Sequence, residues 1–120
     1  DVASIFQAYL TWWIATLQRV PGAEPDGSQY PLESMQPAMH AFWDAYVAAR
    51  GFTPAEADAE LERAVSYAGA RMLQTVYETL AWAQNLTQHS VWQVQACINI
   101  LNAPRAAASD LLGFRAGVYA

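Results

Sequence analysis

The chain contains no lysine, and this absence excludes several kinds of active site. All six basic residues are arginine, against eleven acidic residues, which gives a formal net charge of −5. Without lysine, the chain has no P-loop lysine, no Schiff-base lysine and no kinase-type lysine that binds ATP. An acidic chain with scattered arginines is a poor electrostatic partner for nucleic acid, so we expect no nucleic-acid partner.

Cysteine and long apolar runs are also scarce. Cys97 is the only cysteine, which excludes an intrachain disulfide and favours a reducing compartment, the cytoplasm. Its neighbours are apolar, so we expect it to pack in the core. No apolar run approaches the roughly eighteen residues of a membrane span, and no signal peptide is visible. We therefore expect no membrane partner.

Catalytic motifs are missing as well. The sequence has no Gly-x-Ser-x-Gly motif, no glycine-rich phosphate loop and no obvious histidine partner for Cys97, so it predicts no catalytic residue. His40 and Asp44 share one helical face at a spacing that could chelate a metal, but two such ligands are common by chance. We predict no metal site, and we interpret His89 as a surface histidine.

Charged residues make up 14% of the chain and hydrophobic residues 54%, which excludes disorder and predicts one domain of 120 residues. The apolar periodicity favours an all-α fold of about five helices with one long central helix. The expected helices cover residues 2–19, from 34–37 to 50, 54–86, from 87–90 to 101, and 102–112. Residues 21–31 are expected to form a flexible loop and residues 114–120 a loose tail.

Capping signals mark the expected helix ends. Thr53 can cap the long helix, Pro54 suits its first position, and Glu56 completes a capping box. The other expected caps are Asp1 and Asn102 at N-termini and Gly51 and Gly113 at C-termini. Gly69 indicates close helix packing rather than a hinge.

The aromatic pairs 12–13 (WW) and 42–43 (FW) are expected in the core. The alternative is that they line an apolar ligand pocket, as helical bundles often provide.

Two lines of side chains run along the long helix, because residues three and four apart share a helical face. The apolar line is Leu61, Val65, Ala68, Met72, Val76, Leu80 and Ala83. The hydrogen-bonding line is Arg63, Tyr67, Arg71, Gln74 and Glu78. This polar line faces either water or a cavity, in which planar arginines would match phosphate or carboxylate. Both interpretations stay open at this point.

Segments spread over nearly the whole chain carry a family resemblance. They are 1–4 (DVAS), 30–37 (YPLESMQP), 42–43 (FW), 63–71 (RAVSYAGAR), 99–101 (NIL) and 111–113 (LLG), with Gln74, Glu78 and Pro104. In this order they resemble the helical part of the C-lobe in aminoglycoside-phosphotransferase-like kinases, a superfamily that includes the choline and homoserine kinases. Residues 1–4 resemble the start of the helix that follows the metal-binding aspartate strand.

The resemblance implies a fragment of a larger bacterial transferase, an ATP-dependent kinase. The chain lacks the family's N-lobe, its catalytic loop (His-x-Asp-x-x-x-x-Asn) and its metal-binding aspartate strand, so it should be inactive alone and hold no cofactor. ATP and Mg would belong to the parent protein. The implied partners are the missing N-terminal lobe and catalytic segment, and a small-molecule or peptide acceptor.

The resemblance also implies site residues. By position, Asp1 would anchor the catalytic loop. The residues that would border the acceptor site are those of the polar line: Arg63, Tyr67, Arg71, Gln74 and Glu78.

Two other interpretations remain. One is an all-helical ligand-binding or dimerisation module, such as the effector domain of a transcriptional regulator, which would need a basic helix-turn-helix upstream. The other is a helical scaffold without a ligand.

Overall fold

The computed structural model describes residues 1–17 and 31–115, and every regular element within these ranges is an α-helix. The helices are α1 (Val2–Ala15), α2 (Leu32–Arg50), α3 (Pro54–Trp82), α4 (Gln88–Asn102) and α5 (Pro104–Leu112). The predicted all-α fold of about five helices with one long helix is confirmed.

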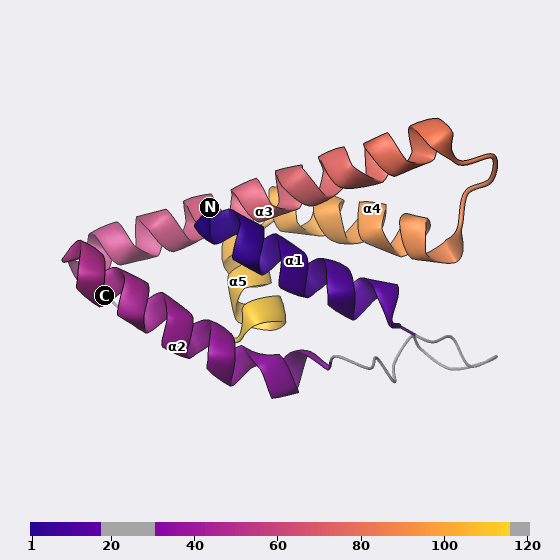
Figure 1. Ribbon diagram of the computed structural model, residues 1–120. Helices are drawn as coiled ribbons and strands as arrows, with labels where there is room; N and C mark the ends of the chain where they lie inside the picture. Colours follow the sequence, from indigo (N-terminus) through magenta and orange to yellow (C-terminus); the bar gives the residue numbers. More distant parts are fainter. Residues whose placement is uncertain (18–30, 116–120) are drawn as a thin grey trace.

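Helix α3 is the longest helix of the described residues and runs along the length of the molecule (Figure 1). Helix α4 turns back antiparallel along the second half of α3, and α1, α4 and α5 all pack against α3. Helix α2 runs in the opposite direction to α1 and leads into the start of α3 (Figure 1). None of the helices in the described part of the chain combines the length and hydrophobicity that crossing a membrane requires.

The start of α3 confirms the predicted capping box. The Thr53 hydroxyl accepts a hydrogen bond from the Glu56 backbone N–H at 3.3 Å, and the Glu56 carboxylate accepts one from the Thr53 N–H at 2.8 Å. The helix ends at Trp82 rather than at the expected residue 86, because Ala83 adopts extended backbone angles.

The core forms on the apolar line of α3. Five of its members are buried: Leu61, Val65, Ala68, Met72 and Val76. Leu80 is half-buried, and Ala83 lies beyond the helix and is exposed. Phe6 and Leu10 of α1 and the buried Cys97 of α4 join this core, so the prediction for Cys97 is confirmed.

Gly69 lies at a close contact between α3 and α4. A Cβ atom at this position would lie 2.7 Å from Cγ2 of Ile100 and 3.2 Å from its Cβ. Since Ile100 is fully buried, α4 cannot come this close to any larger residue without moving. The expectation of close packing is confirmed.

The other helix ends agree only in part. Gly51 and Gly113 end α2 and α5 in the left-handed conformation, with φ of +66° and +73°, as expected. Asp1 occupies the N-cap position of α1, but its side chain makes no capping hydrogen bond. Asn102 is the last residue of α4 and does not cap α5, so that prediction is wrong.

Helices α1 and α2 have different bounds from those expected. Helix α1 stops at Ala15, where the Thr16 hydroxyl donates to the backbone carbonyl of Trp12 at 2.9 Å. Helix α2 begins at Leu32, so Pro37 lies in its second turn rather than its first. Residue 19 and residues 21–30 of the expected loop lie outside the described residues.

The C-terminal segment corrects another expectation. Phe114 is only 5% exposed, and its ring packs against those of Phe6 and Trp43 at 6.2 Å each. The prediction of a loose tail is therefore wrong at Phe114, because burial of its ring holds the chain after α5 onto the core. Residues 116–120 lie outside the described part.

The aromatic pairs are divided between core and surface. Trp43 is fully buried and Phe42 is half-buried, as the core interpretation expects. Trp13 is half-buried, whereas Trp12 is 59% exposed. The core prediction is wrong for Trp12, because adjacent helical residues point about 100° apart and only one side of α1 faces the bundle.

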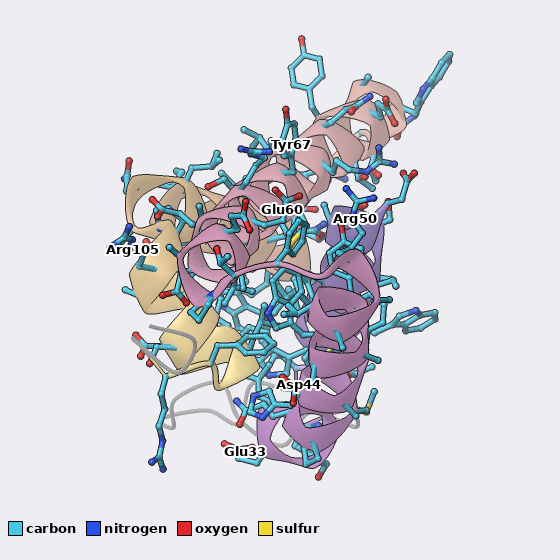
Figure 2. The ribbon with its side chains drawn as sticks, turned by 90° about the vertical axis from the view of Figure 1, so that its left-hand side faces the viewer. Glu33, Asp44, Arg50, Glu60, Tyr67 and Arg105 are labelled. Atoms are coloured by element: carbon cyan, nitrogen blue, oxygen red, sulfur yellow. The ribbon has the colours of Figure 1, made fainter. Side chains whose placement is uncertain are left out.

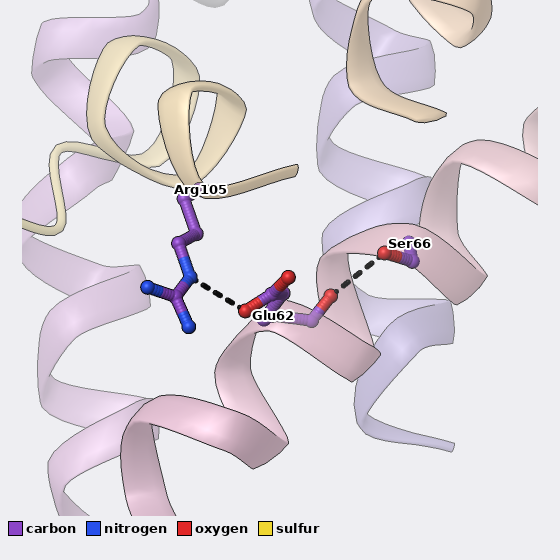
Figure 3. Close-up of polar contacts among 3 residues, drawn as sticks. All are labelled: Glu62, Ser66 and Arg105. Carbon is purple, nitrogen blue, oxygen red and sulfur yellow. Dashed lines mark hydrogen bonds and ion pairs between the residues drawn. The ribbon is translucent and has the colours of Figure 1, made fainter. Parts of the chain in front are cut away.

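Helix α5 is linked to α3 by one ion pair. Arg105 Nε lies 2.6 Å from Glu62 Oε2, and the Ser66 hydroxyl donates to the Glu62 carbonyl one turn further on, at 2.9 Å (Figure 3). The Arg105 side chain is 80% exposed, so the pair contributes little to stability.

Candidate functional site

The polar line of α3 lies on the side of the helix opposite its buried residues. All five members are exposed: Arg63, Tyr67, Arg71, Gln74 and Glu78. Figure 2 shows Tyr67 and Glu60 on the outer side of α3. In the described part of the chain, the line therefore faces solvent rather than a cavity of its own.

Four of these side chains differ in how they are held. Arg63 forms an exposed ion pair with Glu60, with Nη1 3.0 Å from Oε2. Gln74 donates to the Glu78 carboxylate at 2.9 Å. Both are contacts within one helix that contribute little. The Tyr67 ring is 61% exposed, and its hydroxyl makes no hydrogen bond to a described residue.

Arg71 differs because another helix positions it. Its Nε donates to Gln7 Oε1 of α1 at 3.1 Å, and Gln7 Nε2 donates to the Thr75 hydroxyl at 3.2 Å. Neither Nη nitrogen of Arg71 has a partner among the described residues. The guanidinium is therefore oriented through one edge, and its other edge is free to bind a carboxylate or a phosphate.

Asp1 is exposed at the start of α1. The catalytic loop that the resemblance would place beside it is not part of the chain, so its role as an anchor stays a prediction.

The two histidines hold chain segments together. His40 Nε2 lies 2.9 Å from the Leu112 carbonyl, and its ring packs 4.7 Å from Phe114. His89 Nε2 lies 2.9 Å from the Leu17 carbonyl. Because a carbonyl only accepts, Nε2 carries the proton in both. His89 is exposed, which confirms its interpretation as a surface histidine, although its contact with Leu17, just after α1, was not expected.

The described residues gather no group of three or more His, Cys, Asp or Glu side chains that could hold a metal ion. Burial raises the pKa of the Cys97 thiol to about 11, which leaves it protonated and unreactive at neutral pH. Burial, aided by the nearby charge of Glu33, raises the pKa of Tyr9 to about 12, and its hydroxyl donates to the Leu32 carbonyl at 2.9 Å. Both side chains therefore serve the fold.

A cleft between the end of α1, one face of α4 and α5 encloses about 590 Å³. This volume falls within the range of small-molecule sites. Trp13 of α1, Leu17 just after α1 and Trp92 of α4 form much of its apolar wall. Asn99 of α4 and Asp110 of α5 contribute polar groups. The five residues of the polar line are not among those that line this cleft.

The sequence predictions missed this cleft, although α4 carries a pattern that indicates it. Besides Ala96, the residues of α4 that line the cleft are Trp92, Gln95, Asn99 and Asn102. Their spacing of three, four and three places them on one helical face, in a helix without Asp, Glu, Lys or Arg. An uncharged line of one tryptophan and three amides is as unusual as the polar line of α3.

Comparison with known proteins gives no relative: no family model, no curated protein and no solved structure matches this chain.

Proposed function

We propose that this chain is the helical, acceptor-side part of an ATP-dependent phosphotransferase. The proposal rests on the resemblance of segments along nearly the whole chain to aminoglycoside-phosphotransferase-like kinases. Under it, the N-lobe and catalytic segment of the parent protein supply ATP, Mg and the reacting groups. The use of ATP would place the protein in the cytoplasm.

The single structural observation that supports the proposal is the contact between Gln7 and Arg71. Gln7 lies within the first two turns of α1, about 9 Å along the helix from its start. The resemblance places the metal-binding strand directly before that start. Arg71 would therefore be held, with its Nη edge free, on the side of α3 nearest the catalytic segment.

This arrangement favours an acidic acceptor. A guanidinium with a free edge pairs with a carboxylate or phosphate through two parallel hydrogen bonds. Of the two arginines on the line, Arg63 is already paired with Glu60, so we assign acceptor binding to Arg71 first. Tyr67, Gln74 and the remaining members would border the same site.

The test uses the intact parent protein and measures phosphoryl transfer to acidic small molecules and peptides. We expect Arg71→Ala to raise the KM for the acceptor roughly 10- to 100-fold, because a hydrogen bond to a charged group contributes about 1.5–3 kcal/mol. The matched control is Arg105→Ala, since Arg105 is also held through Nε but lies on α5. Wild-type kinetics for Arg71→Ala would remove this residue from the site.

The second candidate is an all-helical dimerisation module, and one observation favours it. The hairpin of α3 and α4 exposes many large apolar side chains: Leu73, Tyr77, Trp82, Leu86, Val91, Ile98 and Leu101. Exposed apolar side chains on neighbouring helices favour an interface where they form one patch. A purified chain that sediments as a dimer and unfolds cooperatively supports the module, whereas an aggregating chain supports a separated lobe.

A further inference from the structure

The cleft between α1, α4 and α5 is held open by contacts at both of its ends. At one end, His89 on the first turn of α4 donates to the carbonyl of Leu17, just after α1. At the other end, α4 stops at Asn102 and Pro104 starts α5 in a new direction after a single residue. The separation of the walls is therefore fixed by the fold, as in a preformed ligand site.

Aromatic and small side chains line the walls. Trp92 stands edge-on to His89, with ring centroids 5.2 Å apart, and this contact orients the indole. Trp13 contributes a second half-buried indole from α1. The lining residues also include Ala103, which joins α4 to α5, and Ala106 of α5, whose small side chains leave space in the cleft. Flat surfaces and small opposing residues suit a flat aromatic molecule.

The polar side of the cleft offers both donors and acceptors. Gln95 Nε2 donates to Asn99 Oδ1 at 2.9 Å, which leaves the Gln95 oxygen as an acceptor and the Asn99 amide nitrogen as a donor. The side-chain amide of Asn102 has no hydrogen-bond partner among the described residues. These groups lie along one line of α4, beside the apolar wall.

Among the described residues that line the cleft, Asp110 is the one with a charged side chain. Helices α1 and α4 carry no Asp, Glu, Lys or Arg that could neutralise it. The two arginines of the neighbouring segment are Arg105, which pairs with Glu62, and Arg115, and neither lines this cleft. The negative charge of Asp110 therefore disfavours an anionic ligand and favours a cationic one.

We propose that this cleft binds a flat aromatic molecule that carries hydrogen-bonding groups along one edge and no negative charge. The ring packs against the indoles of Trp13 and Trp92, and its polar edge bonds to the amide line of α4. The site is distinct from the polar line on α3 and does not depend on the phosphotransferase proposal.

The test titrates the full chain with three probes that share one ring system and differ in charge: indole, tryptamine and indole-3-acetate. Binding is followed by NMR through the aromatic proton shifts of the probe. For probes of this size we expect dissociation constants on the order of 1 mM. Indole and tryptamine should bind, with indole-3-acetate roughly fivefold or more weaker than tryptamine. No detectable binding of indole or tryptamine, or tightest binding of indole-3-acetate, would overturn the proposal.

Variants then locate the binding. Trp92→Ala should weaken it roughly tenfold, as loss of a stacking surface does. Trp82→Ala is the matched control, because Trp82 is 90% exposed on α3 and does not line the cleft. Asp110→Asn should remove most of the preference for tryptamine over indole-3-acetate.

Ala106→Trp keeps the test decisive if Trp92→Ala does not fold. Ala106 is exposed on α5 and lines the cleft, so a large side chain there fills the space without disturbing the core. This variant should keep the melting temperature of the wild type and lose binding. Unchanged binding in a folded Ala106→Trp protein would place the probe elsewhere and refute the cleft.

Discussion

Because Gly69 lies in close contact with α4, we predict that Gly69→Ala destabilises the protein, although glycine-to-alanine substitutions usually stabilise a helix. In an exposed helical position, replacing glycine by alanine gains about 1 kcal/mol of helix propensity. At Gly69 the new methyl would lie 2.7 Å from Ile100 Cγ2 and 3.2 Å from Ile100 Cβ. Overpacking of this kind costs about 1–3 kcal/mol. We therefore expect Gly69→Ala to lower the free energy of unfolding by up to about 2 kcal/mol.

The assay is denaturant unfolding of Gly69→Ala beside Ala70→Gly, the neighbouring exposed position of the same helix. Propensity alone predicts opposite signs for the two variants, whereas close packing predicts that both destabilise. Ile100→Leu removes the Cγ2 atom and should reduce the cost of Gly69→Ala in the double variant. If Gly69→Ala stabilises the chain by about as much as Ala70→Gly destabilises it, the packing argument is refuted.

Three further predictions concern single side chains. Hydrogen bonds from Thr53, first its N–H and then its hydroxyl, lower the pKa of Glu56 below its usual value of 4.5. The ionised carboxylate therefore stabilises the folded state at pH values above 4.5. The stability difference between wild type and Glu56→Gln should be present at pH 7 and vanish as the pH falls through the lowered pKa; a difference independent of pH would contradict this. His40→Ala leaves the Leu112 carbonyl without its donor and should cost about 1–3 kcal/mol in denaturant unfolding, whereas no loss would show that the bond contributes nothing. Because burial raises the pKa of Cys97 to about 11, a thiol reagent at pH 8 should react slowly with the native chain and quickly in denaturant; rapid native labelling would contradict the burial.

The sequence predicted those parts of the fold that local physics determines. The capping box at Thr53 and the left-handed glycines depend on residues close in sequence, and both were found as expected. The apolar line of α3 is buried from Leu61 to Val76, whereas Leu80 is half-buried and Ala83 is exposed. Phe114 was missed because its burial depends on rings from α1 and α2, which no local pattern specifies. Trp12 was assigned to the core by composition, although the angular position of the bundle on α1 decides its exposure.

The candidate sites were predicted less well, and for a physical reason. Both interpretations of the polar line are compatible with the sequence, and only the position of the other helices places Arg71 beside Gln7. The cleft forms only where α1, α4 and α5 pack together, so it depends on the tertiary structure. The spacing of its residues on α4 was visible in the sequence. An uncharged line of amides does not by itself distinguish a cleft from a solvent-exposed face.

The proposal of a phosphotransferase is tested most directly by reading the coding sequence immediately upstream of Asp1. The account predicts a catalytic loop of the form His-x-Asp-x-x-x-x-Asn, followed by a strand that carries a metal-binding aspartate and leads into α1. A start codon close to Asp1, or a helix-turn-helix in place of the catalytic segment, would contradict it.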